Sequence, residues 1–249
     1  MRFAIAAAFA LAVTVPAAAE DVPDLSGFWN APVNNFEMPA DLEAKLPPDT
    51  VIITDTGAPE YGRGDFGGLK LTPQAVAHAE AWRPENDMTL TRACLPPSIV
   101  YSVQGPFPFE IHQAPGLLVF RHEYYDQVRL IHTDGRGHPP ADAPHSKMGH
   151  SIGHWEGNEL VVDTTHLAAS TITNNGLDHS ENIHMIERYR LSGDGKTLEA
   201  SQWFEDAETL ENNGARYIRW QRGSDYVRPY ECDPSFALEY QGVIAQDAE

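Results

Sequence analysis

Histidines are concentrated in one stretch of the chain, where they could carry acid–base or metal chemistry. Nine of the 11 histidines fall between His122 and His184. Imidazole changes its charge near neutral pH and is the commonest protein ligand for metal ions. Carboxylates, among them Asp163, lie in the same stretch. This part of the chain is therefore the first candidate for a functional site.

Alternation along one predicted strand separates two sets of side chains. Successive side chains of a strand face opposite sides of its sheet. Because the apolar set marks the core, we expect Val128, Leu130 and His132 to point inward. Arg129 and Ile131 then point outward. His132 becomes a candidate for a polar-lined interior.

The same alternation on two other predicted strands places Glu187 and Tyr189 on one inward face, and His122 on another. A buried carboxyl without a cationic partner has a raised pKa, which suits a general acid or base near neutral pH. Glu187 is therefore the leading catalytic candidate. The alternative is a structural glutamate that pairs with a core Arg or Tyr.

Residues 148–166 predict a β-hairpin with a two-residue Gly-Asn turn. In that register Trp155 and Leu160 lie opposite each other and mark the core face. His150 and Asp163 lie on the other face. If the N-terminal segment covers that face, the two residues could form a second buried polar pair.

A bound metal is the less favoured interpretation of the histidines. His150 and His154 lie four residues apart on one strand face, and His179 and Glu181 share one side of an extended segment. Zinc needs three or four such ligands, and no spacing here matches a named metal motif. The chain also lacks a nucleophile elbow, a phosphate loop, a dinucleotide fingerprint and a Cys-x-x-Cys pair. We expect no cofactor, with a divalent metal as the alternative.

The elements that must position these residues are mostly short strands. Turn signals separate eight of them, near residues 109–113, 117–124, 127–133, 148–156, 159–166, 183–191, 197–205 and 215–222. Eight antiparallel strands in meander order predict a lipocalin-like barrel or a curved sheet, which could hold one small ligand. A two-sheet sandwich is the alternative.

Before this mainly β domain, expected over residues 106–249, the chain is irregular. Residues 20–105 are rich in Pro and Gly and predict one helix, over residues 74–82, after a Thr-Pro start. Residues 20–249 are expected to form a single folded unit.

Residues 1–19 predict a cleaved signal peptide. Arg2 supplies the basic start, an apolar stretch follows, and Ala17 to Ala19 form a small-residue cleavage site. The apolar run is shorter than the ~20 residues that a membrane-spanning helix needs. We therefore expect a periplasmic or secreted protein.

Cys94 and Cys232 are the two cysteines, and in an exported protein such a pair predicts a disulfide. The formal net charge is −19, so the surface repels phosphate backbones and anionic lipids. Nucleic acid and membrane surfaces are therefore poor partners, and a small molecule is the expected one. The oligomeric state is left open.

The string GHSIGHWEGNELVVDT at residues 149–164 resembles the hairpin motif GHSIGxWEGDxLVVDT of a group of exported, largely uncharacterised bacterial proteins. The resemblance extends over most of the chain after the signal peptide and implies a shared fold. It implies no particular activity. The chain departs from the pattern at His154, where Arg or Lys is usual, and at Asn158, where Asp is usual. The matching residues that could do chemistry are Asp134, Arg136, His138, His150, Asp163, His179 and Glu187.

Together these features predict a cofactor-independent acid–base enzyme, a lyase, isomerase or hydrolase, that acts on a small, partly apolar or aromatic molecule. Glu187 would exchange the proton with His132 or His150, while Arg136 would hold a substrate oxygen. The expected catalytic residues are Glu187, His132, His150, Asp163 and His179, and the expected substrate contacts are Arg136, Asp134, His122 and Tyr189. The alternatives are a lipocalin-like carrier without catalysis and a His-rich metal-binding periplasmic protein.

Overall fold

The computed structural model describes residues 22–31, 36–54, 61–223 and 226–240, so the predicted signal peptide lies outside the described residues. The described strands are β1 (Gly27–Trp29), β2 (Thr50–Ile52), β3 (Phe109–Ala114), β4 (Leu117–His122), β5 (Val128–His132), β6 (His150–Glu156), β7 (Glu159–Thr165), β8 (Ser170–Thr173), β9 (Leu177–His179), β10 (His184–Leu191), β11 (Thr197–Glu205) and β12 (Asn213–Gln221). The helices are α1 (Ala40–Glu43), α2 (Pro73–Ala81), α3 (Pro84–Asp87), α4 (Ile99–Ser102) and the 3-10 turn η1 (Tyr124–Asp126).

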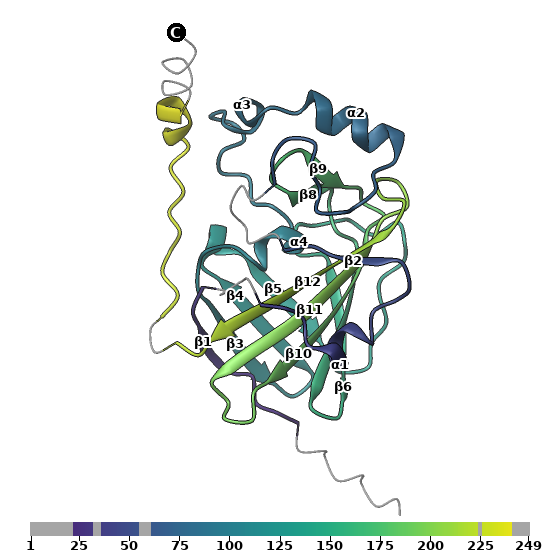
Figure 1. Ribbon diagram of the computed structural model, residues 1–249. Coiled ribbons are helices and arrows are strands. Elements are labelled where there is room, and N and C mark those ends of the chain that lie inside the picture. The colour runs from purple at the N-terminus through teal and green to yellow at the C-terminus, as the bar shows by residue number, and fades with distance from the viewer. Residues whose placement is uncertain (1–21, 32–35, 55–60, 224–225, 241–249) are drawn as a thin grey trace, which may run out of the picture.

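Ten of these strands form one strongly curled sheet (Figure 1). Its order is β1-β3-β4-β5-β6-β7-β10-β11-β12-β2. Neighbours are antiparallel except for the parallel pairs β5–β6 and β12–β2. A bridge between Trp29 and Arg222 links β1 to the end of β12, so the sheet curls into a half-barrel. The mainly β prediction, with a barrel or curved sheet, is confirmed.

The β6–β7 hairpin has the predicted register. Trp155 pairs with Leu160. Gly157 opens the turn with φ at +60°, a backbone conformation that a side chain rarely adopts. Leu160 is fully buried, whereas His150 and Asp163 lie partly exposed on the opposite face, as expected.

Aromatic side chains fill the concave side of the sheet. The rings of Phe109, Phe120, Tyr189 and Trp220 are at most 2% exposed. Their centroids lie 5.4 Å apart for Phe109 and Trp220, and 5.5 Å apart for Phe120 and Tyr189. The inward prediction for the alternate residues of β4 is correct, because His122 is also buried. Side chains therefore occupy the space in which a lipocalin-like protein would hold its ligand.

The face prediction for β5 is wrong. Arg129 and Ile131 point into the core, at 1% and 0% exposure. Val128 and Leu130 point outward and are 50% and 45% exposed, and His132 lies with them on the outer face. Hydrophobicity favoured the opposite choice, but the guanidinium of Arg129 forms an ion pair inside the core, and this pair decides which side of β5 is buried.

N-terminal residues cover part of the outer face of the sheet. Met38 and Leu42 pack on Trp203 of β11 in a second apolar cluster. Nearby, Nζ of Lys45 lies 2.6 Å from a carboxylate oxygen of Glu159 on β7. The N-terminal segment and the sheet are thus joined by both apolar and ionic contacts.

Helices α2, α3 and α4 lie toward one end of the half-barrel, together with the β8–β9 hairpin (Figure 1). Helix α2 confirms the helix expected at residues 74–82, and the hydroxyl of Thr72 caps it by accepting a hydrogen bond from the Ala75 N–H. Arg216 of β12 donates to the carbonyl of Val100 in α4 at 2.9 Å. This bond ties α4 to the sheet.

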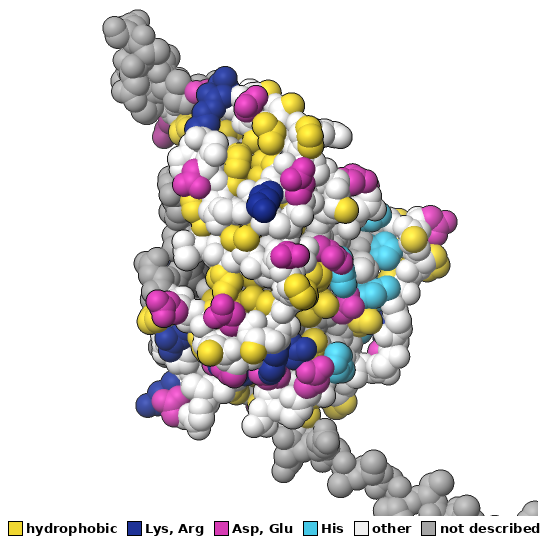
Figure 2. All heavy atoms as spheres, turned by 45° about the vertical axis from the view of Figure 1, so that its right-hand side comes forward, with side chains coloured by type: hydrophobic (Ala, Val, Ile, Leu, Met, Phe, Trp, Pro, Cys, Tyr) yellow, Lys and Arg dark blue, Asp and Glu magenta, His cyan; other side chains and the backbone are white. Residues whose placement is uncertain are grey.

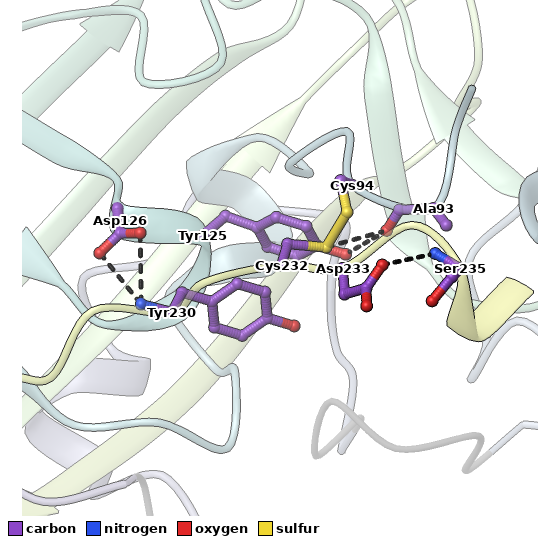
Figure 3. Close-up of a disulfide and its surroundings, with 8 residues drawn as sticks. All are labelled: Ala93, Cys94, Tyr125, Asp126, Tyr230, Cys232, Asp233 and Ser235. Carbon is purple, nitrogen blue, oxygen red and sulfur yellow. Dashed lines mark hydrogen bonds between the residues drawn. A yellow bond between two sulfur atoms is a disulfide. The ribbon is translucent and has the colours of Figure 1, made fainter. Parts of the chain in front are cut away.

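The predicted disulfide is present between Cys94 and Cys232, with Cα atoms 5.8 Å apart (Figure 3). Beside it, the hydroxyl of Tyr125 donates to the carbonyl of Ala93 at 3.0 Å. The Tyr230 N–H donates to the carboxylate of Asp126 at 3.2 Å. The disulfide therefore fastens the C-terminal segment to the chain that precedes α4.

Among the described residues, no helix has both the length and the apolar character required to cross a membrane.

Candidate functional site

Glu187, the leading candidate from the sequence, is paired with a core arginine. Its side chain is fully buried, and Oε2 lies 2.5 Å from Nη2 of Arg129. Oε1 accepts a hydrogen bond from the hydroxyl of Tyr189 at 2.7 Å. Arg129 also donates to the hydroxyls of Ser151 and Thr164. The carboxylate thus has the cationic partner that the catalytic prediction assumed to be absent.

Neither histidine expected to exchange a proton with Glu187 is placed to do so. His132 and His150 both lie on the outer face of the sheet, whereas Glu187 is buried in the core. His122 does face the interior, but burial and the nearby charge of Arg129 lower its pKa to about 3. Its Nε2 has no hydrogen-bond partner among the described residues. His122 therefore stays neutral near pH 7.

His179 is buried beside a serine. Its Nε2 lies 2.7 Å from Oγ of Ser98, and its Nδ1 lies 2.7 Å from the carbonyl oxygen of Ser180. Because a carbonyl only accepts, Nδ1 carries the proton and Nε2 accepts from the Ser98 hydroxyl. Burial lowers the pKa of His179 to about 4. At 1% and 0% exposure, His179 and Ser98 join β9 to the start of α4.

A group of histidines surrounds Asp163 on the outer face of the sheet; Figure 2 shows histidine side chains gathered on one face. Oδ1 of Asp163 lies 2.9 Å from Nε2 of His184 and 3.2 Å from Nε2 of His138. Nδ1 of His138 lies 2.9 Å from Nδ1 of His150. We call Asp163, His138, His150 and His184 the histidine cluster.

Strands and one loop position the cluster. His150, Asp163 and His184 lie on β6, β7 and β10, which are neighbours in the sheet. His138 comes from the loop over residues 133–149 that joins β5 to β6. Because β5 and β6 are parallel, this loop has to return along the sheet before β6 begins. That return path brings His138 over β6 and β7.

His166 helps to hold this loop in place. It follows β7 with a positive φ of 56°. Its Nε2 lies 2.9 Å from the carbonyl oxygen of Pro140, and its own carbonyl accepts from the Ser146 N–H at 3.0 Å. Since the Pro140 carbonyl only accepts, Nε2 of His166 donates. Two bonds therefore anchor the loop that carries His138.

The carboxylate of Asp163 sets the direction of the hydrogen bonds. Burial raises its pKa, but the bonds from His184 and His138 outweigh burial and hold the pKa below its usual value. An ionised carboxylate only accepts, so Nε2 of both histidines carries a proton. In neutral His138 the other nitrogen, Nδ1, then accepts from Nδ1–H of His150. Nε2 of His150 keeps its lone pair.

His150 is thus available as a base at neutral pH. Burial, followed by the charges of His138 and His132, lowers its pKa. The ring of His132 stacks on that of His150, with centroids 5.4 Å apart. Nε2 of His150 has no hydrogen-bond partner among the described residues. His184 differs, because its hydrogen bond to Asp163 raises its pKa.

The two predicted substrate contacts in the loop bind each other. Nη2 of Arg136 lies 2.6 Å from Oδ2 of Asp134, and both side chains are substantially exposed. The hydrogen bonds from Arg136 lower the pKa of Asp134 to about 2. The pair lies close to His132, whose pKa is lowered by burial and by the charge of Arg136. Arg136 is therefore neutralised beside the cluster.

His184 was not among the residues predicted from the sequence, and His138 was predicted without a specific role. Alternation puts His184 on the outer face of β10, but its contact with Asp163 depends on the pairing of β7 with β10 across the β8–β9 hairpin. The signal for His138 was its place in the Asp-Gly-Arg-x-His-Pro segment of the resemblance. The path of its loop could not be read from alternation.

A metal centre and an enclosed pocket are the other kinds of site that a β protein could carry. In the part of the chain that the structure describes, no group of three or more His, Cys, Asp or Glu side chains is arranged to hold a metal ion. A surface pocket of about 220 Å³ lies between β1 and the C-terminal segment, lined in part by Phe28, Glu123 and Tyr226. It contains none of the residues selected from the sequence, so the histidine cluster is the stronger candidate.

In comparisons with known proteins, no family model, no curated protein and no solved structure matches this chain. The likeness to exported bacterial proteins with the same hairpin motif therefore stays a prediction. The functional argument depends on the geometry of the cluster.

Proposed function

We propose that this protein is an exported acid–base enzyme in which the histidine cluster is the site and His150 is the catalytic base or acid. The reaction class is the one expected from the sequence, a lyase, isomerase or hydrolase without an organic cofactor. This proposal places the catalytic site on the outer face of the sheet, whereas the sequence predicted it in the interior of the barrel. The observation that carries the proposal is the 2.9 Å contact between His138 and His150, continued by the contact of His138 with Asp163.

The order of the hydrogen bonds supports a base at one end of a relay. When Nε2 of His150 takes a proton from a substrate, the ring becomes an imidazolium. Its Nδ1–H remains bonded to His138, and the carboxylate of Asp163 stabilises the positive charge through Nε2–H of His138. The same imidazolium can return the proton to a leaving group. General acid–base catalysis of this kind contributes typically about 10²–10⁴-fold in rate.

The solvent exposure of the candidate side chains favours a catalytic site on the outer face of the sheet over one in the interior. Glu187 and His122 are at most 5% exposed, whereas His150 and Asp163 are both partly exposed. A carrier would need a deep apolar pocket, and the rings of Phe120 and Trp220 occupy the centre of the half-barrel. The packed interior therefore favours a surface site for chemistry over an enclosed site for storage.

The disulfide between Cys94 and Cys232 agrees with an exported protein, because disulfides form and persist in oxidising compartments. Together with the predicted signal peptide, it supports a periplasmic or secreted location as part of the proposal.

Two probe reactions test the proposal. Hydrolysis of 4-nitrophenyl acetate reports acyl transfer, and deuterium exchange at the methyl group of acetophenone in D2O reports proton abstraction from carbon. We expect wild type to accelerate at least one of them, and His150→Gln to lose about 100-fold of that acceleration. The matched control is His154→Gln, which removes an exposed histidine that pairs with Glu156 outside the cluster.

The control variant should keep full activity. The proposal fails if neither reaction exceeds the buffer rate, or if His154→Gln and His150→Gln lose activity equally.

A further inference from the structure

We propose that the substrate of this site carries a neutral, flat apolar ring that lies on the outer face of β4 and β5. This inference rests on the proposed function and names the substrate class. The ring would contact Val119, Val128 and Leu130, which we call the apolar strip.

The strip presents aliphatic side chains to solvent on the outer face of β4 and β5. Val128 and Leu130 are 50% and 45% exposed. Val119 of β4 pairs directly with Leu130 of β5, so the two side chains share the outer face. A contiguous exposed apolar patch rimmed by polar residues can mark a ligand site.

The strip leads directly to the histidine cluster. Leu130 and His132 lie two residues apart on β5, a separation of about 7 Å on one face. The ring of His132 is then 5.4 Å from that of His150. In the next strand Ile152 pairs with His132 and continues the apolar surface toward Asp163, which is its own partner on β7. A small molecule on Leu130 can therefore extend a substituent to His150.

Neighbouring parts of the outer face are already covered. Met38 and Leu42 pack over Trp203 of β11, and the loop that carries His138 lies over β6 and β7. The face of β4 and β5 lies beyond both covers, where Leu130 remains exposed. The strip and the cluster are thus two adjoining parts of one surface.

The charges around the apolar strip favour a substrate whose ring is neutral. Arg136 is paired with Asp134, and Arg121, the charged neighbour of Val128 on β4, contacts Glu110 and the carbonyl of Val227. No cation in this set is available for a substrate anion, and the net charge of −19 repels anions at a distance. The fitting class is a phenol or an aryl ketone with a weakly acidic O–H or C–H bond, whose proton passes to Nε2 of His150.

A second copy of the chain is a poorer occupant. Stable protein–protein interfaces bury about 800 Å² on each partner. Two half-exposed side chains supply only a small part of such an area.

Methyl and imidazole NMR spectra with phenol as the probe test this inference. We expect saturable shifts at the methyl groups of Val128 and Leu130 and at the ring of His150. Leu130→Thr should weaken phenol binding about tenfold, which corresponds to about 1.4 kcal/mol. Benzoate, the anionic analogue, should bind at least tenfold more weakly than phenol. The control is Leu238→Thr, since Leu238 is 54% exposed on the C-terminal segment, and it should leave binding unchanged.

Absence of saturable shifts, equal binding to Leu130→Thr, or equal binding of benzoate would overturn the inference. Light scattering tests whether a second copy of the chain occupies the strip instead. A dimer that Leu130→Thr dissociates would show that the strip is a dimer interface, and this result would also overturn the inference. The same titration on His150→Gln separates the two proposals. If His150→Gln binds phenol while wild type catalyses neither probe reaction, the acid–base function is refuted. The apolar strip would still be a binding site for a ring.

Discussion

Nδ1 of His138 lies 2.9 Å from Nδ1 of His150, so the two rings share one proton across the gap between a loop and a strand. Two unprotonated nitrogens would repel at this distance, and two protonated ones would clash. The carboxylate of Asp163 resolves the choice, because it holds the proton of His138 on Nε2. The contact turns a cluster of side chains into an ordered relay that ends at Nε2 of His150.

Stability should fall as the pH is lowered, because two buried histidines stay neutral in the folded state. The pKa values of His122 and His179 are about 3 and about 4, against 6.5 in the unfolded chain. Between pH 6.5 and 4 the unfolded state therefore binds more protons. Each histidine should lower the free energy of unfolding by about 1.4 kcal/mol per pH unit in that window.

Urea unfolding of wild type and His122→Phe at pH 7.5, 5.5 and 4.5 measures this effect. Phenylalanine keeps the stacking on Phe109 and removes the unpartnered Nε2. The variant should match wild type at pH 7.5 and lose less stability at pH 4.5. Parallel pH profiles for the two proteins would show that His122 is not buried as a neutral ring.

The ion pair of Arg129 and Glu187 should act on stability and not on turnover. Glu187→Gln leaves the buried guanidinium uncompensated, at a cost of about 3–5 kcal/mol. Replacing both partners, as Arg129→Met with Glu187→Leu, should cost much less, because no buried charge remains unpaired. Urea unfolding measures the free energies, and probe turnover is read below the unfolding transition. A Glu187→Gln protein that stays stable but has lost turnover would show that the catalytic site lies in the interior, at Glu187.

Loss of the disulfide should destabilise the fold and release the C-terminal segment. Cys94 and Cys232 are 138 positions apart, and for such a loop the entropy model gives an upper figure of about 5 kcal/mol. We expect the double Ser variant to melt at a lower temperature and to be cut by protease within residues 226–240 before the sheet unfolds. An unchanged melting temperature would mean that the contact of Tyr230 with Asp126 is enough to hold the segment.

Chelation should leave folding unaffected. Among the described residues no three ligands converge on a metal position, and the core consists of packed apolar side chains. The melting temperature should therefore be the same before and after exhaustive dialysis against EDTA. A large drop that zinc or copper reverses would instead favour the metal-binding alternative, because binding to the folded state alone stabilises it.

The sequence predicted local features correctly. The positions of the eight predicted strands, the Trp155–Leu160 register and the Cys94–Cys232 bond all follow from alternation, turn residues and cysteine count. The expected antiparallel order is wrong at one place, because β5 and β6 pair in parallel. The strands and the hairpin register depend on residues that are close together in the chain. The disulfide follows because the chain has two cysteines, which can bond only with each other.

Long-range polar contacts could not be predicted in the same way. The face of β5 is decided by an ion pair between Arg129 and Glu187, which are 58 residues apart. The candidate site depends on the return path of the loop that carries His138, and on β10 pairing with β7 to bring His184 to Asp163. Strand alternation predicts neither contact. The sequence therefore identified His150 and Asp163, and named His138 only through the resemblance, without placing it between them.

The most direct test of the relay is the protonation pattern of the imidazole rings at pH 7.5, read from long-range 1H–15N NMR spectra. We predict that His138 carries its proton on Nε2, that His150 carries its proton on Nδ1, and that Asp163→Asn changes the pattern of His138 while His154 stays unchanged. The relay is contradicted if Nε2 of His150 is protonated and Nδ1 is not, because the base would then point at His138 and away from any substrate.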